Sequence, residues 1–72
     1  MARVSFSDIF QEHPDGSLEP RQRIRVGGVL IGPGARFINT TFSGVNFSDP
    51  QIKGHDLEIQ TDEGITVITG IY

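Results

Sequence analysis

The chain has 72 residues, with nine acidic and six basic side chains, two histidines and no cysteine. This length predicts one small domain over residues 1–72, which buries only about 60 % of the surface that its unfolded chain exposes. Without cysteine the chain forms no disulfide and no thiolate metal site, so oligomerisation is the remaining common way to stabilise so small a core. The net charge of −3 is not that of a protein that coats nucleic acid. No apolar leader or membrane-length apolar run is present, which predicts a soluble, unexported, cytoplasmic protein with no membrane partner.

The first predicted element is a short helix that begins after Ser5. Ser5 and Asp8 have the spacing of a capping box, in which each side chain reaches the other residue's free backbone N–H. Pro14 ends the element, because the residue before a proline avoids helical geometry. A helix of two turns at most is too short to stand alone and has to dock its apolar residues. The alternative is a strand with Val4 and Phe6 on one face.

A turn at residues 14–17 leads toward a predicted strand at residues 21–26. The turn has the sequence Pro-Asp-Gly-Ser, in which proline presets φ, aspartate bonds to its own backbone and glycine takes positive φ. In the strand, Ile24 and Val26 alternate with arginines and point inward. Three arginines then project from the other face: Arg21, Arg23 and Arg25.

Glycines dominate residues 27–34 and frame a short apolar run at residues 29–31. No Lys-Ser or Lys-Thr pair follows them, so the segment does not match a phosphate-binding loop. The glycines predict a break or bulge after the strand and a second turn before residue 35.

Five apolar residues then recur at a spacing of five, which matches neither the period of a strand nor that of a helix. Small residues stand two positions before the first three centres, and Asn46 precedes the third. The segment of residues 35–57 therefore resembles the pentapeptide-repeat family, which implies a square-sectioned β-helix coil. Ordinary short, bent strands with inward apolar side chains are the other interpretation. The five centres are Phe37, Phe42, Phe47, Ile52 and Leu57.

The C-terminal residues predict a β-hairpin. Two β-rich runs, 56–61 and 65–72, flank a three-residue loop with Gly64 at its left-handed position. Strict alternation places Leu57 and Ile59 opposite the inward residues of the second run, which we expect to be Ile65, Val67 and Ile71. Ile68 and Tyr72 then lie on the other face. A strand that is apolar on both faces is usually covered on both, so we expect self-association through Ile68, Ile71 and Tyr72.

The three arginines of the predicted strand at residues 21–26 suggest a different function. Side chains at i, i+2 and i+4 of a strand lie about 7 Å apart, which suits the phosphates of an extended nucleic acid strand, and the guanidinium fork binds phosphate in pairs of hydrogen bonds. Pairing with acidic residues across the sheet is the interpretation that we favour, because nine acids are available. No tryptophan or tyrosine is interleaved to stack bases, which further disfavours nucleic acid.

We expect no catalytic, cofactor-binding or metal-binding residues. His13 and His55 have no second ligand at metal spacing. His55-Asp56 together with Ser43 or Ser48 lacks the sequence context of a hydrolytic site.

The sequence thus predicts a mainly β single domain with a short N-terminal helix, short bent strands and a C-terminal β-hairpin. Its predicted function is that of a non-enzymatic interaction or assembly module that works as a homo-oligomer, with a dimer as the first expectation. An anion- or nucleic-acid-binding module that uses Arg21, Arg23 and Arg25 is the alternative.

Overall fold

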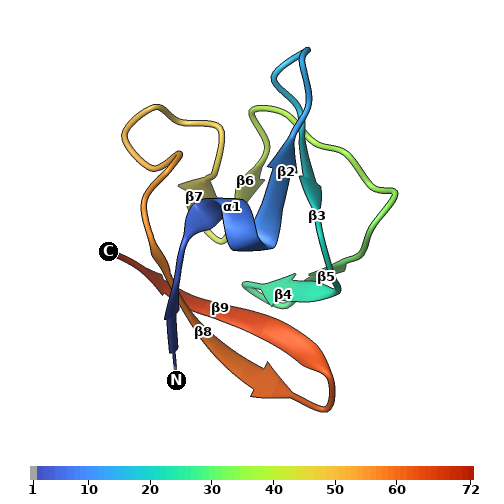
Figure 1. Ribbon diagram of the computed structural model, residues 1–72, viewed down its shortest axis with the longest axis vertical. Helices are drawn as coiled ribbons and strands as arrows, with labels where there is room; N and C mark the ends of the chain where they lie inside the picture. The colour runs from blue at the N-terminus through green and yellow to red at the C-terminus, as the bar shows by residue number, and fades with distance from the viewer. Residues whose placement is uncertain (1) are drawn as a thin grey trace.

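The computed structural model describes residues 2–72 and confirms a small, mainly β domain with one short helix (Figure 1). In chain order its elements are β1 (Ala2–Val4), α1 (Phe6–Ile9), β2 (Phe10–Glu12), β3 (Leu18–Pro20), β4 (Ile24–Val26), β5 (Val29–Ile31), β6 (Thr41–Phe42), β7 (Val45–Asn46), β8 (Leu57–Asp62) and β9 (Ile65–Ile71).

Five strands form the main sheet, in the order β1-β8-β9-β4-β5. All neighbours are antiparallel except β4 and β9, which run parallel. Two further hairpins, β2–β3 and β6–β7, lie with α1 on one side of this sheet (Figure 1). The main sheet is therefore a single layer with one face toward the core.

Two-residue turns close the hairpins of the main sheet. Gly27 and Gly28 both have positive φ, at 56° and 82°, and Glu63 and Gly64 follow the same pattern at 52° and 79°. Positive φ at both central residues is the signature of the type I′ turn, whose twist matches that of the flanking strands. The C-terminal hairpin was predicted correctly, but its loop is one residue shorter than expected because Asp62 pairs with Ile65.

The N-terminal helix is present and is shorter than predicted. The Ser5 backbone N–H and hydroxyl both donate to the Asp8 carboxylate, at 3.4 and 2.9 Å. The helix ends after one turn because Phe10 is extended, with φ −119° and ψ 141°. Phe10 instead begins β2, which pairs with β3 in a hairpin that the sequence analysis did not predict. The predicted turn at residues 14–17 joins these two strands.

The strand predicted at residues 21–26 covers residues 24–26 only. β3 ends at Pro20, and the next backbone N–H, that of Arg21, donates to the Ile9 carbonyl at 2.8 Å. This bond holds the backbone of Arg21 against the junction of α1 and β2, so Arg21 does not join the main sheet. Ile24 and Val26 are buried as predicted.

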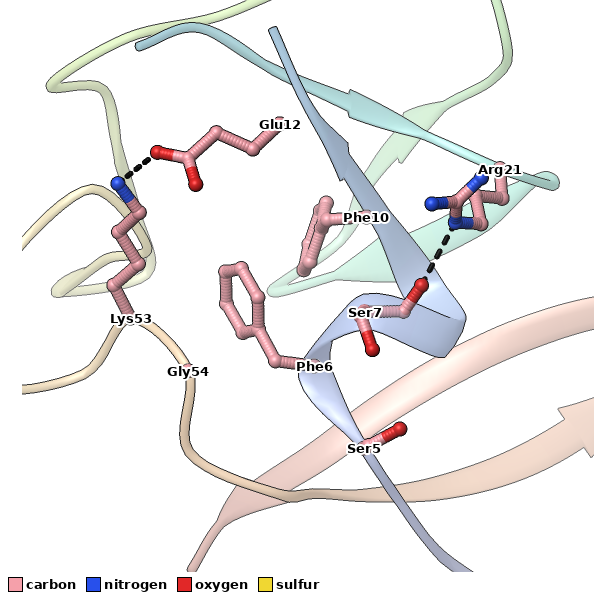
Figure 2. A pocket seen from close by; sticks show the side chains of 8 residues that line it. All are labelled: Ser5, Phe6, Ser7, Phe10, Glu12, Arg21, Lys53 and Gly54. Carbon is pink, nitrogen blue, oxygen red and sulfur yellow. Dashed lines mark hydrogen bonds and ion pairs between the residues drawn. The ribbon is translucent and has the colours of Figure 1, made fainter.

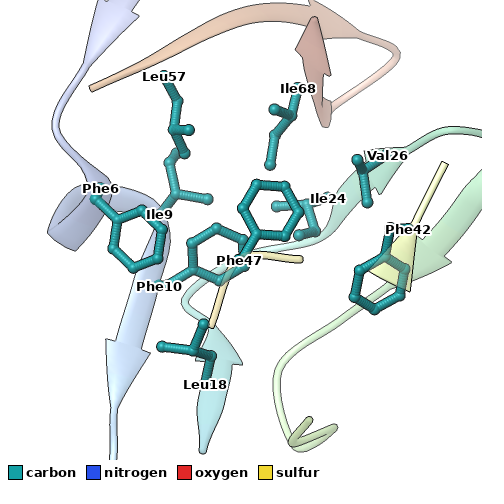
Figure 3. Close-up of a cluster of buried hydrophobic side chains, with 10 residues drawn as sticks. All are labelled: Phe6, Ile9, Phe10, Leu18, Ile24, Val26, Phe42, Phe47, Leu57 and Ile68. Carbon is teal, nitrogen blue, oxygen red and sulfur yellow. The ribbon is translucent and has the colours of Figure 1, made fainter. Parts of the chain in front are cut away.

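The core lies between the main sheet and the elements that cover it (Figure 3). Three centres of the five-residue repeat are buried in it, Phe42, Phe47 and Leu57, while Phe37 and Ile52 pack against it. The repeat segment contains only the two-residue strands β6 and β7, and turns occupy much of the remainder. Phenylalanine rings contact one another through the core, with centroid separations of 5.0–6.3 Å, in the pairs Phe6–Phe10, Phe10–Phe37, Phe10–Phe47, Phe37–Phe42 and Phe42–Phe47.

The predicted faces of β9 are wrong for most of the strand. Thr66 and Ile68 point into the core, whereas Ile65 and Val67 lie on the opposite face. A β-bulge explains the difference: Ile59 pairs with Ile68 and Glu58 pairs with Gly70, so Thr69 is an extra residue. An extra residue exchanges the two faces, and strict alternation therefore fails across it.

Candidate interaction surface

The solvent-facing side of the main sheet can be assigned from the strand register, since residues paired across strands share a face. Val67 pairs with Gln60 on β8 and with Arg25 on β4, and Arg25 pairs with Leu30 on β5. The same rule places Ile65 beside Asp62, and Arg3 beside Glu58. We call the resulting surface the outer face, and it consists of Arg3, Arg25, Leu30, Glu58, Gln60, Asp62, Ile65 and Val67.

Aliphatic side chains occupy the middle of the outer face. Val67 and Ile65 are half-buried on β9, and Leu30 on the edge strand β5 is 56 % exposed. The charged residues form pairs around them: the Arg25 guanidinium binds the Asp62 carboxylate at 2.9 Å. Arg3 binds Asp56 at 2.8 Å. The outer face thus carries two cations, Arg3 and Arg25, and two carboxylates, Glu58 and Asp62, with Asp56 as a third carboxylate at its edge.

The three residues predicted to self-associate do not share one environment. Ile68 is a core residue at 8 % exposure, which is the opposite of its expected position. Ile71 and Tyr72 are exposed, at 36 % and 49 %. Ile71 borders a hollow of about 260 Å³ that Phe42, Val45 and other apolar side chains line.

Tyr72 is held in place by several contacts. The Arg3 guanidinium lies 4.3 Å from the centroid of its ring, a favourable cation–π geometry. Its backbone N–H donates to the Asp56 carbonyl at 2.9 Å, and its main-chain oxygen lies 2.8 Å from His55 Nδ1. The end of the chain is thus fixed beside β1 and the outer face.

The structure separates the three arginines that the sequence placed on one strand face. Arg25 lies in β4 and pairs with Asp62. Arg21 precedes the strand, and its Nε donates to the Ser7 carbonyl at 2.7 Å. Among residues 2–72, Arg21 and Arg23 are the basic side chains without a carboxylate within 4.0 Å.

Neither histidine lies in a metal-binding cluster. His13 Nε2 lies 2.7 Å from Glu19 Oε1, and His55 binds the main chain of Tyr72. Within residues 2–72, no group of three or more His, Cys, Asp or Glu side chains is placed to hold a metal ion. The part of the chain that is described also contains no helix of the length and apolarity needed to cross a membrane.

Two carboxylates with shifted pKa lie in or beside the β2–β3 hairpin and support its structure. The Ser17 hydroxyl and N–H both donate to Asp15, at 2.6 and 2.9 Å, and lower the pKa of its carboxyl group. The Gly34 N–H donates to Glu19 at 2.8 Å, and with the His13 side chain it lowers the pKa of Glu19. Hydrogen bonds to the charged form of a carboxyl group have this effect.

Sequence reasoning missed the apolar centre of the outer face, because it assigned Ile65 and Val67 to the core. No protein-family model, no curated protein and no solved structure matches the chain.

Proposed function

We propose that the protein is a non-enzymatic assembly module that forms a homodimer through the outer face of its main sheet. One observation carries this proposal: over residues 65–67 of β9, the aliphatic side chains lie on the solvent side of the sheet and a threonine lies on the core side. Thr66 lies inward at 8 % exposure, while the aliphatic side chains of Ile65 and Val67 face outward.

The inward threonine is accommodated by a specific hydrogen bond. Gln22 Nε2 donates to Thr66 Oγ1 at 3.0 Å, so the buried hydroxyl has a partner, as buried polar groups generally do. Among residues 2–72, no second layer covers the outward side of Ile65 and Val67, which are half-buried on the open face of a single-layer sheet. Apolar residues at the centre of an exposed sheet are typical of an interface.

A second copy of the chain is the occupant that fits this face best. A two-fold interface brings the same surface together from both subunits, so the surface has to be complementary to itself. The outer face carries both positive and negative side chains around its aliphatic centre, so a cation of one copy can meet a carboxylate of the other.

The size of the face limits the expected affinity. At about 3.3 Å per residue and about 4.8 Å between strands, the face measures roughly 20 by 20 Å. The projected area of the face is therefore smaller than the ~800 Å² of accessible surface that each partner buries in a standard interface. We therefore expect a dimer with a micromolar dissociation constant.

Sedimentation velocity over a wide concentration range tests the proposal. Wild type is expected to shift from monomer to dimer, while Val67→Lys, which places a charge at the centre of the face, is expected to remain monomeric. Gln51→Lys adds the same charge at an exposed turn position away from the face and is expected to dimerise like wild type. A wild-type protein that stays monomeric at high micromolar concentration would refute the proposal, as would a Val67→Lys variant that dimerises normally.

The alternative, an anion- or nucleic-acid-binding module built on Arg21, Arg23 and Arg25, has less support. Its geometry required one strand face, but Arg21 and Arg23 precede β4, and Arg25 pairs with Asp62. Salt-sensitive retention on heparin that Arg23→Glu abolishes would favour it.

A further inference from the structure

On the solvent side of the main sheet, the two strands that flank β9 carry opposite charges. β9 lies between β8 and β4 (Figure 1). The outer-face residues of β8 are Glu58, Gln60 and Asp62, while the outer-face residue of β4 is Arg25. The aliphatic centre on β9 therefore has a negative strand on one side and a positive strand on the other.

Arg23 adds a second cation on the β4 side. The preceding side chain, that of Gln22, donates to the hydroxyl of Thr66, which lies on the core side of the sheet. Successive side chains of an extended chain point to opposite sides, so Arg23 points to the solvent side, as Arg25 does. The Arg23 carbonyl accepts a hydrogen bond from the Thr66 N–H at 3.1 Å, so the main chain at Arg23 continues the pairing of β4 with β9.

Arg23 and Asp62 lie at the same level on the two sides of β9. Ile24 pairs with Thr66, so Arg23, one residue earlier in a parallel pair, lies beside Ile65. Asp62 pairs with Ile65 from the other side. A cation and a carboxylate are thus related by a reflection of position across β9.

Opposite charges on this side of the sheet remain without an ion-pair partner within the chain. Among residues 2–72, neither Arg23 nor Glu58 has an oppositely charged group within 4.0 Å. Arg23 is exposed, and the side chain of Asp62 is 58 % exposed although it binds Arg25. An ionised carboxylate has about four lone-pair sites, so Asp62 can accept hydrogen bonds from a second arginine.

Charge complementarity distinguishes between the two aligned ways in which two copies can meet through this face. Packed sheets usually keep their strands within about 30° of each other. A two-fold axis perpendicular to the strands places β8 on β8 and β4 on β4, so like charges face one another, which is unfavourable. A two-fold axis along β9 keeps β9 on β9 and places β4 of each copy on β8 of the other. Only the second arrangement brings cations onto carboxylates.

We propose that the two-fold axis of the dimer runs along β9 and that Arg23 of each subunit binds the partner subunit's Asp62. This inference rests on the proposed homodimer and adds the contact that orients its two copies. Rotation about an axis along β9 preserves the position along the strand, so the two groups meet at the same level. Symmetry gives two such ion pairs, one on each side of the aliphatic centre, and the planar fork of arginine suits a carboxylate.

Charge reversal followed by mixing tests this pairing in sedimentation velocity. Arg23→Glu and Asp62→Arg each turn both intersubunit contacts from attraction into repulsion, so each is expected to weaken the homodimer by roughly tenfold or more. An equimolar mixture of the two variants is expected to form a heterodimer with two attractive pairs and a dissociation constant within about threefold of that of wild type. Arg23→Gln and Asp62→Asn remove the charges conservatively and should weaken the dimer by about threefold each, which decides the question if a reversed variant does not fold.

Arg21→Glu is the matched control, because it changes the net charge by the same amount as Arg23→Glu. Arg21 lies beside α1, where its Nε donates to the Ser7 carbonyl at 2.7 Å (Figure 2). Arg21→Glu is therefore expected to dimerise like wild type.

The outcomes separate the pairing from the homodimer itself. If wild type dimerises and Val67→Lys does not, but the mixture binds no more tightly than the single variants, the homodimer stands and the pairing is overturned. The pairing is also overturned if Asp62→Arg dimerises more tightly than wild type, since an axis perpendicular to the strands would place its new cation on the partner subunit's Glu58. Wild type that stays monomeric overturns both proposals.

Discussion

A large contribution to the stability of the core is expected from Phe47. Its side chain is 1 % exposed, and its ring centroid lies 5.0 Å from that of Phe10 and 6.3 Å from that of Phe42. Replacing a buried phenylalanine with alanine costs about 3–5 kcal/mol. Ring–ring contacts add about 0.5–1.5 kcal/mol beyond the buried area, so we expect Phe47→Ala to fall in the upper part of that range.

This loss is large for so short a chain. At about 0.05–0.15 kcal/mol per residue, the whole domain has a free energy of unfolding of roughly 4–11 kcal/mol. Phe47→Ala is therefore expected to remove about half of the stability or more. Replacing Phe42, at 9 % exposure, and then the half-buried Phe37 with alanine should cost progressively less stability. The reason is that less of each ring is removed from water on folding.

Guanidinium unfolding followed by far-ultraviolet circular dichroism measures these differences, and Phe47→Leu provides a variant of intermediate cost if Phe47→Ala does not fold. The matched control is Ile38→Ala, whose side chain is 50 % exposed and which is expected to change stability by no more than about 0.5 kcal/mol. The inward orientation of the repeat is refuted if Phe47→Ala costs no more than Ile38→Ala.

Two further predictions concern the turns. Gly27→Ala should lower the melting temperature more than Gly28→Ala. Both glycines have positive φ, which costs about 1–2 kcal/mol for alanine. A Cβ at Gly27 would in addition overlap the Cβ of Ser43, whereas a Cβ at Gly28 would face open space. Equal melting temperatures would contradict the close approach of the two hairpins. The folded protein lowers the pKa values of Asp15 and Glu19 from 3.8 and 4.5. The two carboxylates therefore stabilise the fold fully above these unfolded-state values, and this stabilisation is lost as pH falls through the folded-state values. Asp15→Asn should lose less stability on acidification than wild type, and an unchanged pH profile would contradict this.

Local sequence signals were sufficient to predict the elements that are stabilised by contacts between residues close together in the chain. The capping box of Ser5 and Asp8, the Asp15 turn and the C-terminal hairpin all form where they were predicted. The inward direction of Phe42 and Phe47 also follows from the five-residue spacing. In each of these cases the stabilising contact lies within a few residues or is set by a repeated pattern.

The features that were missed depend on contacts between distant residues. The β2–β3 hairpin has only three residues per strand, and the repeat segment supports it. Phe10 packs against the rings of Phe37 and Phe47, and the backbone of Leu18 exchanges hydrogen bonds with that of Phe37. The bulge at Thr69 exchanges the faces of β9. Its one sequence signal is the adjacent Gly70 inside the strand, since glycine in a strand often marks a bulge, but Gly70 alone does not fix the register. A hollow of about 300 Å³ beside α1 is lined by residues that are distant in the chain, among them Glu12, Arg21 and Lys53, which no pattern in the sequence places side by side.

The correction to β9 changes the reason for expecting assembly without removing it. Ile68 cannot serve as the interface residue, because its side chain fills the core. The same bulge places Thr66 inward and leaves Ile65 and Val67 outward. The aliphatic surface that faces solvent therefore lies at the centre of the sheet. A central position matters because only residues surrounded by other contacts become fully desolvated in an interface. Val67, flanked by Gln60 and Arg25, is therefore the residue at which one substitution should decide between monomer and dimer.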